Sequence, residues 1–166
     1  REHFQPVMSF DHSRPHSDFD RFVATAEQRL RRALVASYGP VIGRDATVDA
    51  LSWAWEHWDR LKGMDNPVGY LYRVGQTASA RYLPVSNAEG YHLAALQNPS
   101  DGEPELIGAL GRLSVQQRSA VVLVHGYEMS QREAADVLGI SVSTVREHLE
   151  RGMDRLRGEL EVSHGH

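Results

Sequence analysis

Apolar side chains recur at three- and four-residue steps through most of this 166-residue chain. Such spacing places them on one face of a helix. No segment alternates apolar and polar residues as a half-buried strand does, and we read the apolar run 121–124 as buried helix because its neighbours are helical. The sequence therefore predicts an all-α protein. The clearest stripe consists of Phe19, Phe22, Val23, Ala26, Leu30, Ala33 and Leu34.

Residues that break helices divide the chain into two small helical domains. Residues 1–17 mix His, Ser, Pro and Asp without periodicity and are expected to form a flexible arm. Residues 84–104 contain Pro and Gly at several points and are expected to be a flexible linker. The first domain, 18–83, and the second, 105–161, lie on either side of this linker.

Each domain has its own set of expected helices. In the first domain a helix begins at residue 18 and ends before Gly39-Pro40, and Asn66-Pro67 marks the start of the third helix. The expected helices are about 18–38, 45–61, 67–83, 105–111, 115–125, 131–138 and 142–160.

Composition excludes several classes of protein. With 41% hydrophobic residues the chain can form a core, and no apolar run approaches the roughly 20 residues that span a bilayer. The chain has no cysteine, so disulfides and thiolate metal sites are excluded. We expect a cytoplasmic protein without membrane insertion. Its net charge of -4 predicts that any nucleic acid is bound through a local patch.

No motif indicates catalysis, a metal or a cofactor. A phosphate-binding loop, a nucleophile elbow and an HExxH sequence are all missing. His12 and His16 have the spacing of two helical ligands, but Pro15 lies between them and no third ligand follows. We therefore expect neither enzyme activity nor a metal site, and no cofactor.

The segment from Ser130 to Leu149 has the pattern of a helix-turn-helix. Ser130 and Glu133 have the spacing of a capping box, and Gly139 suits a left-handed turn. Ser141 is placed to cap a second, longer helix. The small residue expected where the helices cross is Ala135, and the apolar residues between them are Leu138, Ile140, Val145 and Leu149.

In a helix-turn-helix the start of the second helix meets base edges in the major groove. Arg146 can form two hydrogen bonds with guanine, and Glu147 can accept one from cytosine. The alternative interpretation is a helical hairpin whose charged face is exposed to solvent and binds nothing. We favour DNA binding over this alternative. The candidate DNA-reading residues are Val142, Ser143, Thr144, Arg146, Glu147 and Arg151.

The second half resembles region 4 of the extracytoplasmic-function (ECF, group 4) sigma factors of the sigma-70 family. The similar residues are Leu113-Ser114, Gln117-Arg118 and Ala120 to Leu123, followed by Ser130, Glu133 to Ala135 and Leu138 to Val145. The resemblance implies that this half reads the −35 promoter element. The same stretch also resembles LuxR-type regulators, so it does not decide between the two families.

The first half decides in favour of the sigma factors. Residues 54–61 and the pattern Asn66-Pro67, Tyr70-Leu71 and Arg73-Val74 are similar to sigma region 2. The resemblance implies a helix that binds core RNA polymerase, with Asp45, Asp49 and Trp53 as candidates. It also implies a helix that binds the −10 element, with Tyr72, Arg73, Thr77 and Arg81 as candidates. Tyr72 and Tyr82 are candidates for stacking on an unpaired base, and the alternative for each is packing within the domain.

Region 2 departs from the family pattern. Residues 45–49 lack the usual Gln, and Thr77 and Arg81 stand where the family carries Asn, Asp and several Arg. We also expect Trp55 and Trp58, which share a helix face, to pack in the core, and Trp53 to point outward. A divergent sigma factor is therefore expected, with an anti-sigma partner. The rivals are a helix-turn-helix regulator and a degenerate sigma-like protein.

Overall fold

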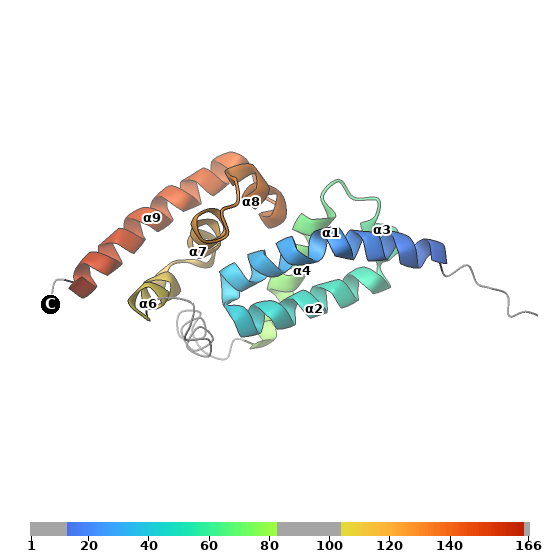
Figure 1. The fold of residues 1–166 in the computed structure, drawn as a ribbon, viewed down its shortest axis with the longest axis horizontal. Helices are drawn as coiled ribbons and strands as arrows, with labels where there is room; N and C mark the ends of the chain where they lie inside the picture. Colours follow the sequence, from blue (N-terminus) through green and yellow to red (C-terminus); the bar gives the residue numbers. More distant parts are fainter. Residues whose placement is uncertain (1–12, 83–103, 165–166) are drawn as a thin grey trace, which may run out of the picture.

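The computed structural model describes residues 13–82 and 104–164, and every regular element in these ranges is helical, as predicted (Figure 1). One group of helices is formed by α1, α2 and α4, and a second by α6 to α9, with α8 lying against α1 and α4. The elements are α1 (Ser13–Tyr38), α2 (Pro40–Glu56), α3 (Trp58–Leu61), α4 (Pro67–Ser79), the 3₁₀ turn η1 (Ala80–Tyr82), α6 (Pro104–Arg112), α7 (Val115–Val121), the π turn η2 (Val122–Gly126), α8 (Gln131–Leu138) and α9 (Val142–His164).

Helix α1 follows the predicted apolar stripe but begins earlier than predicted. Ala26, Leu30 and Leu34 on that stripe are completely buried. The helix starts at Ser13, so the last part of the predicted arm is helical. Pro15 lies in the first turn, where backbone N–H groups have no intrahelical partner and proline is tolerated. Residues 1–12 of the predicted arm lie outside the described residues.

The single helix predicted over 45–61 is two helices with an earlier start. Gly39, at φ 89°, precedes α2, and Pro40 occupies its first turn, where its fixed φ favours helix initiation. The backbone leaves the helical region at His57 (φ −119°), so α2 and the short α3 are separate. The end of the third predicted helix tightens into η1, and Leu83 lies outside the described residues.

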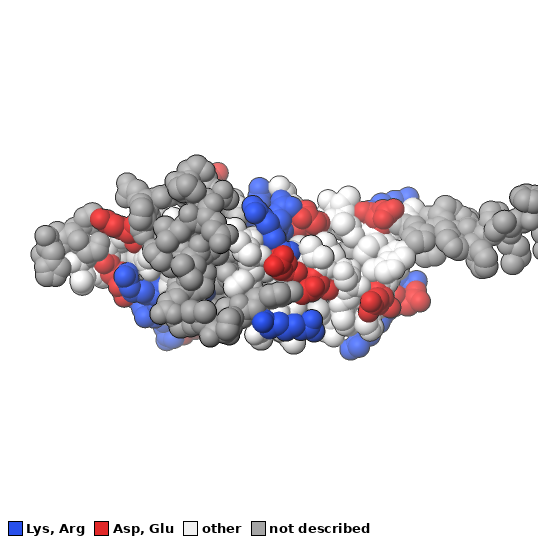
Figure 2. Space-filling view, turned by 90° about the horizontal axis from the view of Figure 1, so that it is seen from below, with Lys and Arg blue, Asp and Glu red and all other residues white. Residues whose placement is uncertain are grey.

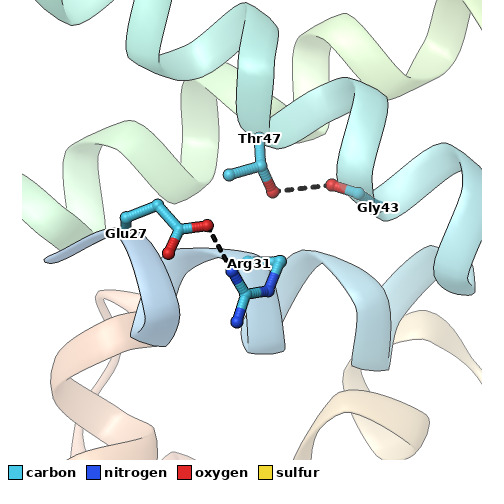
Figure 3. Close-up of polar contacts among 4 residues, drawn as sticks. All are labelled: Glu27, Arg31, Gly43 and Thr47. Carbon is cyan, nitrogen blue, oxygen red and sulfur yellow. Dashed lines mark hydrogen bonds and ion pairs between the residues drawn. The ribbon is translucent and has the colours of Figure 1, made fainter. Parts of the chain in front are cut away.

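Helices α1 and α2 cross closely because small residues line the contact. A Cβ atom on Gly43 would lie 2.5 Å from the Val35 backbone. The buried Thr47 hydroxyl donates to the Gly43 carbonyl at 2.7 Å, so this hydroxyl has a hydrogen-bond partner inside the contact (Figure 3). On α1, Arg31 pairs with Glu27 one turn away. This pairing of α1 and α2 fixes the frame on which α4 and α8 pack.

Two helices of the second half each begin with a capping box. Ser114 and Gln117 cap α7, and Ser130 and Glu133 cap α8. Residues 121–124 continue α7 into the π turn η2, which confirms that this apolar run is helical. Pro104, the last residue of the predicted linker, begins α6, and the rest of that linker falls outside the described residues.

The two halves share one hydrophobic core. The buried residues of α1, α2 and α4 form a single cluster with Leu123, Met129 and residues of α8 and α9. A smaller cluster lies between α6, α7 and α9, around Leu113, Val121 and Leu156. No pattern in the sequence indicates this contact between the halves. In the described part of the chain no helix is long and apolar enough to cross a membrane.

Candidate nucleic-acid interface

The helix-turn-helix has the local geometry that the sequence predicts. The Ser130 hydroxyl accepts from the Glu133 N–H at 3.0 Å, and Glu133 Oε1 accepts from the Ser130 N–H at 3.3 Å. Gly139 has φ 68°, the left-handed conformation that ends α8. The Ser141 hydroxyl accepts from the Thr144 N–H at 3.1 Å, which caps α9. These contacts confirm the predicted bounds of α8 and the predicted start of α9, which runs to His164 rather than ending at about residue 160.

The apolar wedge between α8 and α9 is also confirmed. Val145 is completely buried, Leu138 and Leu149 are nearly so, and Ile140 is half-buried. Ala135 is buried where the helices approach. The wedge holds α9 at a fixed angle to α8, so its outward face is presented as a rigid surface.

That outward face carries most of the predicted DNA-reading residues. Ser143, Arg146, Glu147 and Arg151 are exposed, whereas Val142 and Thr144 are half-buried. The Thr144 hydroxyl lies 2.7 Å from the Ser141 hydroxyl, so it already has a partner. Exposed polar side chains on a fixed helix are the requirement for reading base edges.

Charge pairing distinguishes the two arginines of this face. Arg151 forms an ion pair with Glu147, N to O 2.9 Å, so both must exchange a partner before they contact DNA. Among the described residues no carboxylate pairs with Arg146. Of these two arginines, Arg146 is therefore the more readily available to a guanine. Outside the area covered by residues that are not described, Figure 2 shows acidic and basic side chains interspersed on the face seen from below.

The residues predicted to bind the −10 element do not all reach the surface. Arg73, Thr77 and Arg81 are exposed. Tyr72 is buried, with its hydroxyl 2.6 Å from the Ser37 hydroxyl, and burial raises the pKa of the Tyr72 hydroxyl above its usual range. The prediction that Tyr72 stacks on a base is therefore wrong: its ring belongs to the core. Tyr82 ends η1.

An aromatic cluster that the sequence reasoning missed lies beside these residues. Trp53 stacks on His57 with ring centroids 4.2 Å apart, and Tyr70 lies 5.2 Å from Trp53. The Arg60 guanidinium lies 5.8 Å from the centroid of the Tyr70 ring. The four-residue spacing of Trp53 and His57 was the available signal. We call Trp53, His57 and Tyr70 the aromatic cluster.

The outward face of α2 is apolar at seven-residue intervals. Val41, Val48 and Trp55, the α2 stripe, are 44%, 63% and 48% exposed, with Asp45 exposed between them. Trp55 has one edge against Phe19, but the expectation that it packs in the core is wrong.

Trp58 on α3, and Trp53 and Asp49 on α2, are less exposed than the stripe. Trp58 packs against Phe19 and Phe22, as predicted for a core residue. Trp53 and Asp49 are half-buried. A groove of about 470 Å³ runs beside the stripe between α1 and α2, and its lining includes Val23, Leu51 and Ser52.

The fold and these surfaces define a class: an all-helical DNA-binding protein with a helix-turn-helix in its second half. A family model described as Sigma-70, region 4 matches residues 104–156. The chain is 31% identical to the RNA polymerase sigma-E factor of Streptomyces coelicolor over 154 residues, which are 86% of this chain and 86% of that protein. It is 32% identical to the sigma-E factor of Streptomyces avermitilis over 87% of this chain and 86% of that protein.

Two solved structures are similar over most of both chains. One is the sigma factor RpoE of Bartonella quintana in complex with the anti-sigma factor NepR (TM-score 0.57, 18% identity, 88% of this chain and 98% of that chain). The other is CnrH in complex with the cytosolic domain of CnrY (TM-score 0.57, 25% identity, 89% and 90%). The chain belongs to the RNA polymerase sigma factors of the sigma-70 family, in the ECF group.

Proposed function

We propose that this chain binds RNA polymerase core and directs promoter-specific initiation by reading the −35 element with the start of α9. The observation that carries this proposal is the exposed face around Arg146, held rigidly on the buried Val145–Leu149 side of the same helix. The N-terminal residues of such a helix enter the major groove. Ser143, Arg146 and Glu147 would meet base edges, and Arg151 would meet the phosphate backbone.

Polymerase binding is proposed for the outward face of α2. An apolar stripe beside the exposed Asp45 and the half-buried Asp49 suits a partner helix with apolar and basic side chains. Asp45 and Asp49 remain candidates for this contact. Trp55 offers more exposed apolar surface than Trp53, so we place the aromatic anchor of this interface at Trp55.

The −10 element is proposed to bind across α4 and the aromatic cluster. Arg73 and Arg81 supply exposed cations for phosphates, and Thr77 supplies a hydroxyl. The faces of Tyr70 and its neighbours in the aromatic cluster suit stacking of an unpaired base, a role that the buried Tyr72 cannot perform. Trp53 would then act on DNA rather than on polymerase.

The chain is proposed to bind partners and to catalyse no reaction itself. A sigma factor directs the polymerase and is not an enzyme. We propose an anti-sigma partner, because one similar solved structure is a complex with an anti-sigma factor and the other is a complex with a cytosolic domain. We also propose a cytoplasmic location.

Run-off transcription with core polymerase tests the function: a promoter-specific transcript is expected. Core binding without a transcript would indicate a degenerate factor, and duplex binding without core binding a separate regulator.

Arg146→Ala is expected to weaken −35 binding by about 1–3 kcal/mol, because a two-bond contact with guanine is lost. The measurement is the affinity of the polymerase complex for a −35 duplex, at fixed salt concentration. Arg157→Ala is the matched control, since Arg157 is exposed on the same helix but pairs with Asp154 far from its start. Equal affinities for the two variants would remove Arg146 from the reading surface.

Trp55→Ala is expected to weaken core-polymerase binding about tenfold or more, because large aromatic anchors dominate interfaces. Fluorescence anisotropy of the labelled protein titrated with core polymerase measures this affinity. Val162→Ala truncates an even more exposed apolar side chain, on α9, and serves as the control. If both variants bind like the wild type, the α2 stripe is not the docking surface.

A further inference from the structure

We propose that the groove between α1 and α2 is the docking site of a segment of this chain itself, residues 4–10, which covers the α2 stripe in the free protein. This segment, which we call the arm segment, has the sequence Phe4-Gln5-Pro6-Val7-Met8-Ser9-Phe10. The proposal rests on the proposed function in one respect, because polymerase is proposed to bind the same stripe. The arm segment then competes with polymerase from within the chain.

The groove is apolar on both sides. Phe19 and Val23 of α1 line one side, and Val48, Leu51 and Trp55 of α2 line the other. Val48 is 63% exposed and Trp55 is 48% exposed, so both offer apolar area that a further segment can bury. A segment that docks here must present apolar side chains at intervals that match the stripe.

The apolar residues of the arm segment have the spacing of the α2 stripe. Neighbouring residues of the stripe are seven positions apart, which is about 10 Å along a helix. Phe4, Val7 and Phe10 are three positions apart, which is about 9 Å in a polyproline II conformation. Because this conformation has three residues per turn, the three side chains lie on one face. Pro6 is compatible with it and restricts Gln5 to extended backbone.

The arm segment is attached next to the groove, at the end where Trp55 lies. Helix α1 begins at Ser13, and Phe19 lies about 9 Å further along it. The ring centroids of Phe19 and Trp55 are 5.1 Å apart. The chain from Phe10 to Ser13 covers about 10 Å when extended, so Phe10 reaches Trp55 if the chain turns back at the start of α1. The rest of the arm segment then follows the stripe toward the start of α2.

Charge and tethering also favour the arm segment as the occupant. The segment carries no charged side chain, whereas Asp45 is exposed beside the stripe and Glu56 lines the groove. A segment that brought a carboxylate here would be repelled. Attachment to α1 raises the effective concentration of the arm segment at the groove to about the millimolar range. A weak contact is therefore enough to cover the stripe, and polymerase can still displace it.

Disulfide trapping in the full chain tests the docking, since the chain has no cysteine of its own. Gln5→Cys with Ser52→Cys places one thiol in the arm segment and one in the groove. Gln5→Cys with Gln28→Cys is the matched control, because Gln28 is exposed on α1 half a turn round the helix from Phe19. Gln28 lies about 22 Å along α1 from Ser13, within the roughly 26 Å that the extended chain from Gln5 to Ser13 can cover.

We expect mild oxidation to link the groove pair within one chain, at least about tenfold faster than the control pair. Equal rates overturn the proposal, because they indicate an arm that meets both faces alike. Disulfide-linked dimers in place of linked monomers overturn it in favour of a second copy as the occupant.

The linked monomer of the groove pair should bind core polymerase at least about tenfold more weakly, and reduction should restore the binding. A linked monomer that binds as well as its reduced form overturns the competition. Run-off transcription by the reduced protein tests the proposed function separately, so the two failures can be told apart.

Phe4→Ser with Phe10→Ser should tighten core-polymerase binding at least about threefold, because the stripe is then open in a larger fraction of the protein. Met8→Ser is the matched control: Met8 is apolar but lies off the face that Phe4, Val7 and Phe10 share in polyproline II. Unchanged or weaker binding by the double variant overturns the proposal, and so does an equal gain in the control.

Discussion

Leu34→Ala is expected to lower the free energy of unfolding by about 2–5 kcal/mol, because it leaves a cavity in the core shared by both halves. The Leu34 side chain is completely buried, and the position of a Cβ on Gly75 lies 2.6 Å from Leu34 Cδ1, so α1 and α4 cannot easily close around a smaller residue. Urea denaturation followed by circular dichroism measures the loss.

The control for this change is Val162→Ala, which truncates a side chain that is 67% exposed. That variant should stay within about 0.5 kcal/mol of the wild type. A loss below about 1 kcal/mol for Leu34→Ala would contradict the tight packing of α1 against α4.

Arg118→Met is expected to lower the free energy of unfolding by about 3–5 kcal/mol, because buried carbonyls lose their donor. Arg118 is completely buried and donates to the carbonyls of Ser37, Leu110, Gly111 and Leu113. Methionine fills a similar volume but donates nothing. Because Ser37 belongs to the other half, thermal unfolding of this variant should also broaden or separate into two transitions.

Arg112→Met is the control for the buried arginine. Arg112 is exposed and pairs with Glu159 at 3.5 Å, and such surface pairs contribute about 1 kcal/mol or less. If the free energy of unfolding of Arg118→Met equals that of this control, removing a buried charge has offset the lost hydrogen bonds. Arg118 then does not join the halves.

The helix-turn-helix was predictable because its signals are local. Ser130 and Glu133 lie three positions apart, Gly139 marks a left-handed turn, and Ser141 follows at once. Each signal acts within one or two turns of helix, so sequence spacing alone specifies it. The exposure of Arg146 followed from the same frame, since Val145 and Leu149 fix which side of α9 is buried.

Trp55 was placed on the wrong face because small residues, not aromatic ones, form the contact between α2 and α1. Ala46, Ala50 and Ala54 are completely buried at four-residue steps, and Gly43 extends the same line. The helices approach so closely that only small side chains fit between them. Trp55 is thereby pushed to the edge of the contact, which the spacing of the bulky residues did not reveal.

The contact between the halves could not be predicted from sequence patterns. Arg118 and Ser37 are 81 positions apart, and Asn66 and Asp136 are 70 apart. Their acceptors are backbone carbonyls, which every residue carries, so no side-chain pattern marks them. Tyr72 was misplaced for a related reason: its hydroxyl finds a buried partner on Ser37, and a tyrosine with such a partner can lie in a core.

The capping boxes of α7 and α8 and the Ser141 cap on α9 affect the rate at which the protein associates with DNA. All three helix starts are closed by residues of their own half, so the DNA-reading unit does not depend on α1 or α4 to begin its helices. This unit therefore meets DNA already folded. Recognition then involves no ordering of a disordered segment, and encounter with the groove, rather than a folding step, sets the association rate.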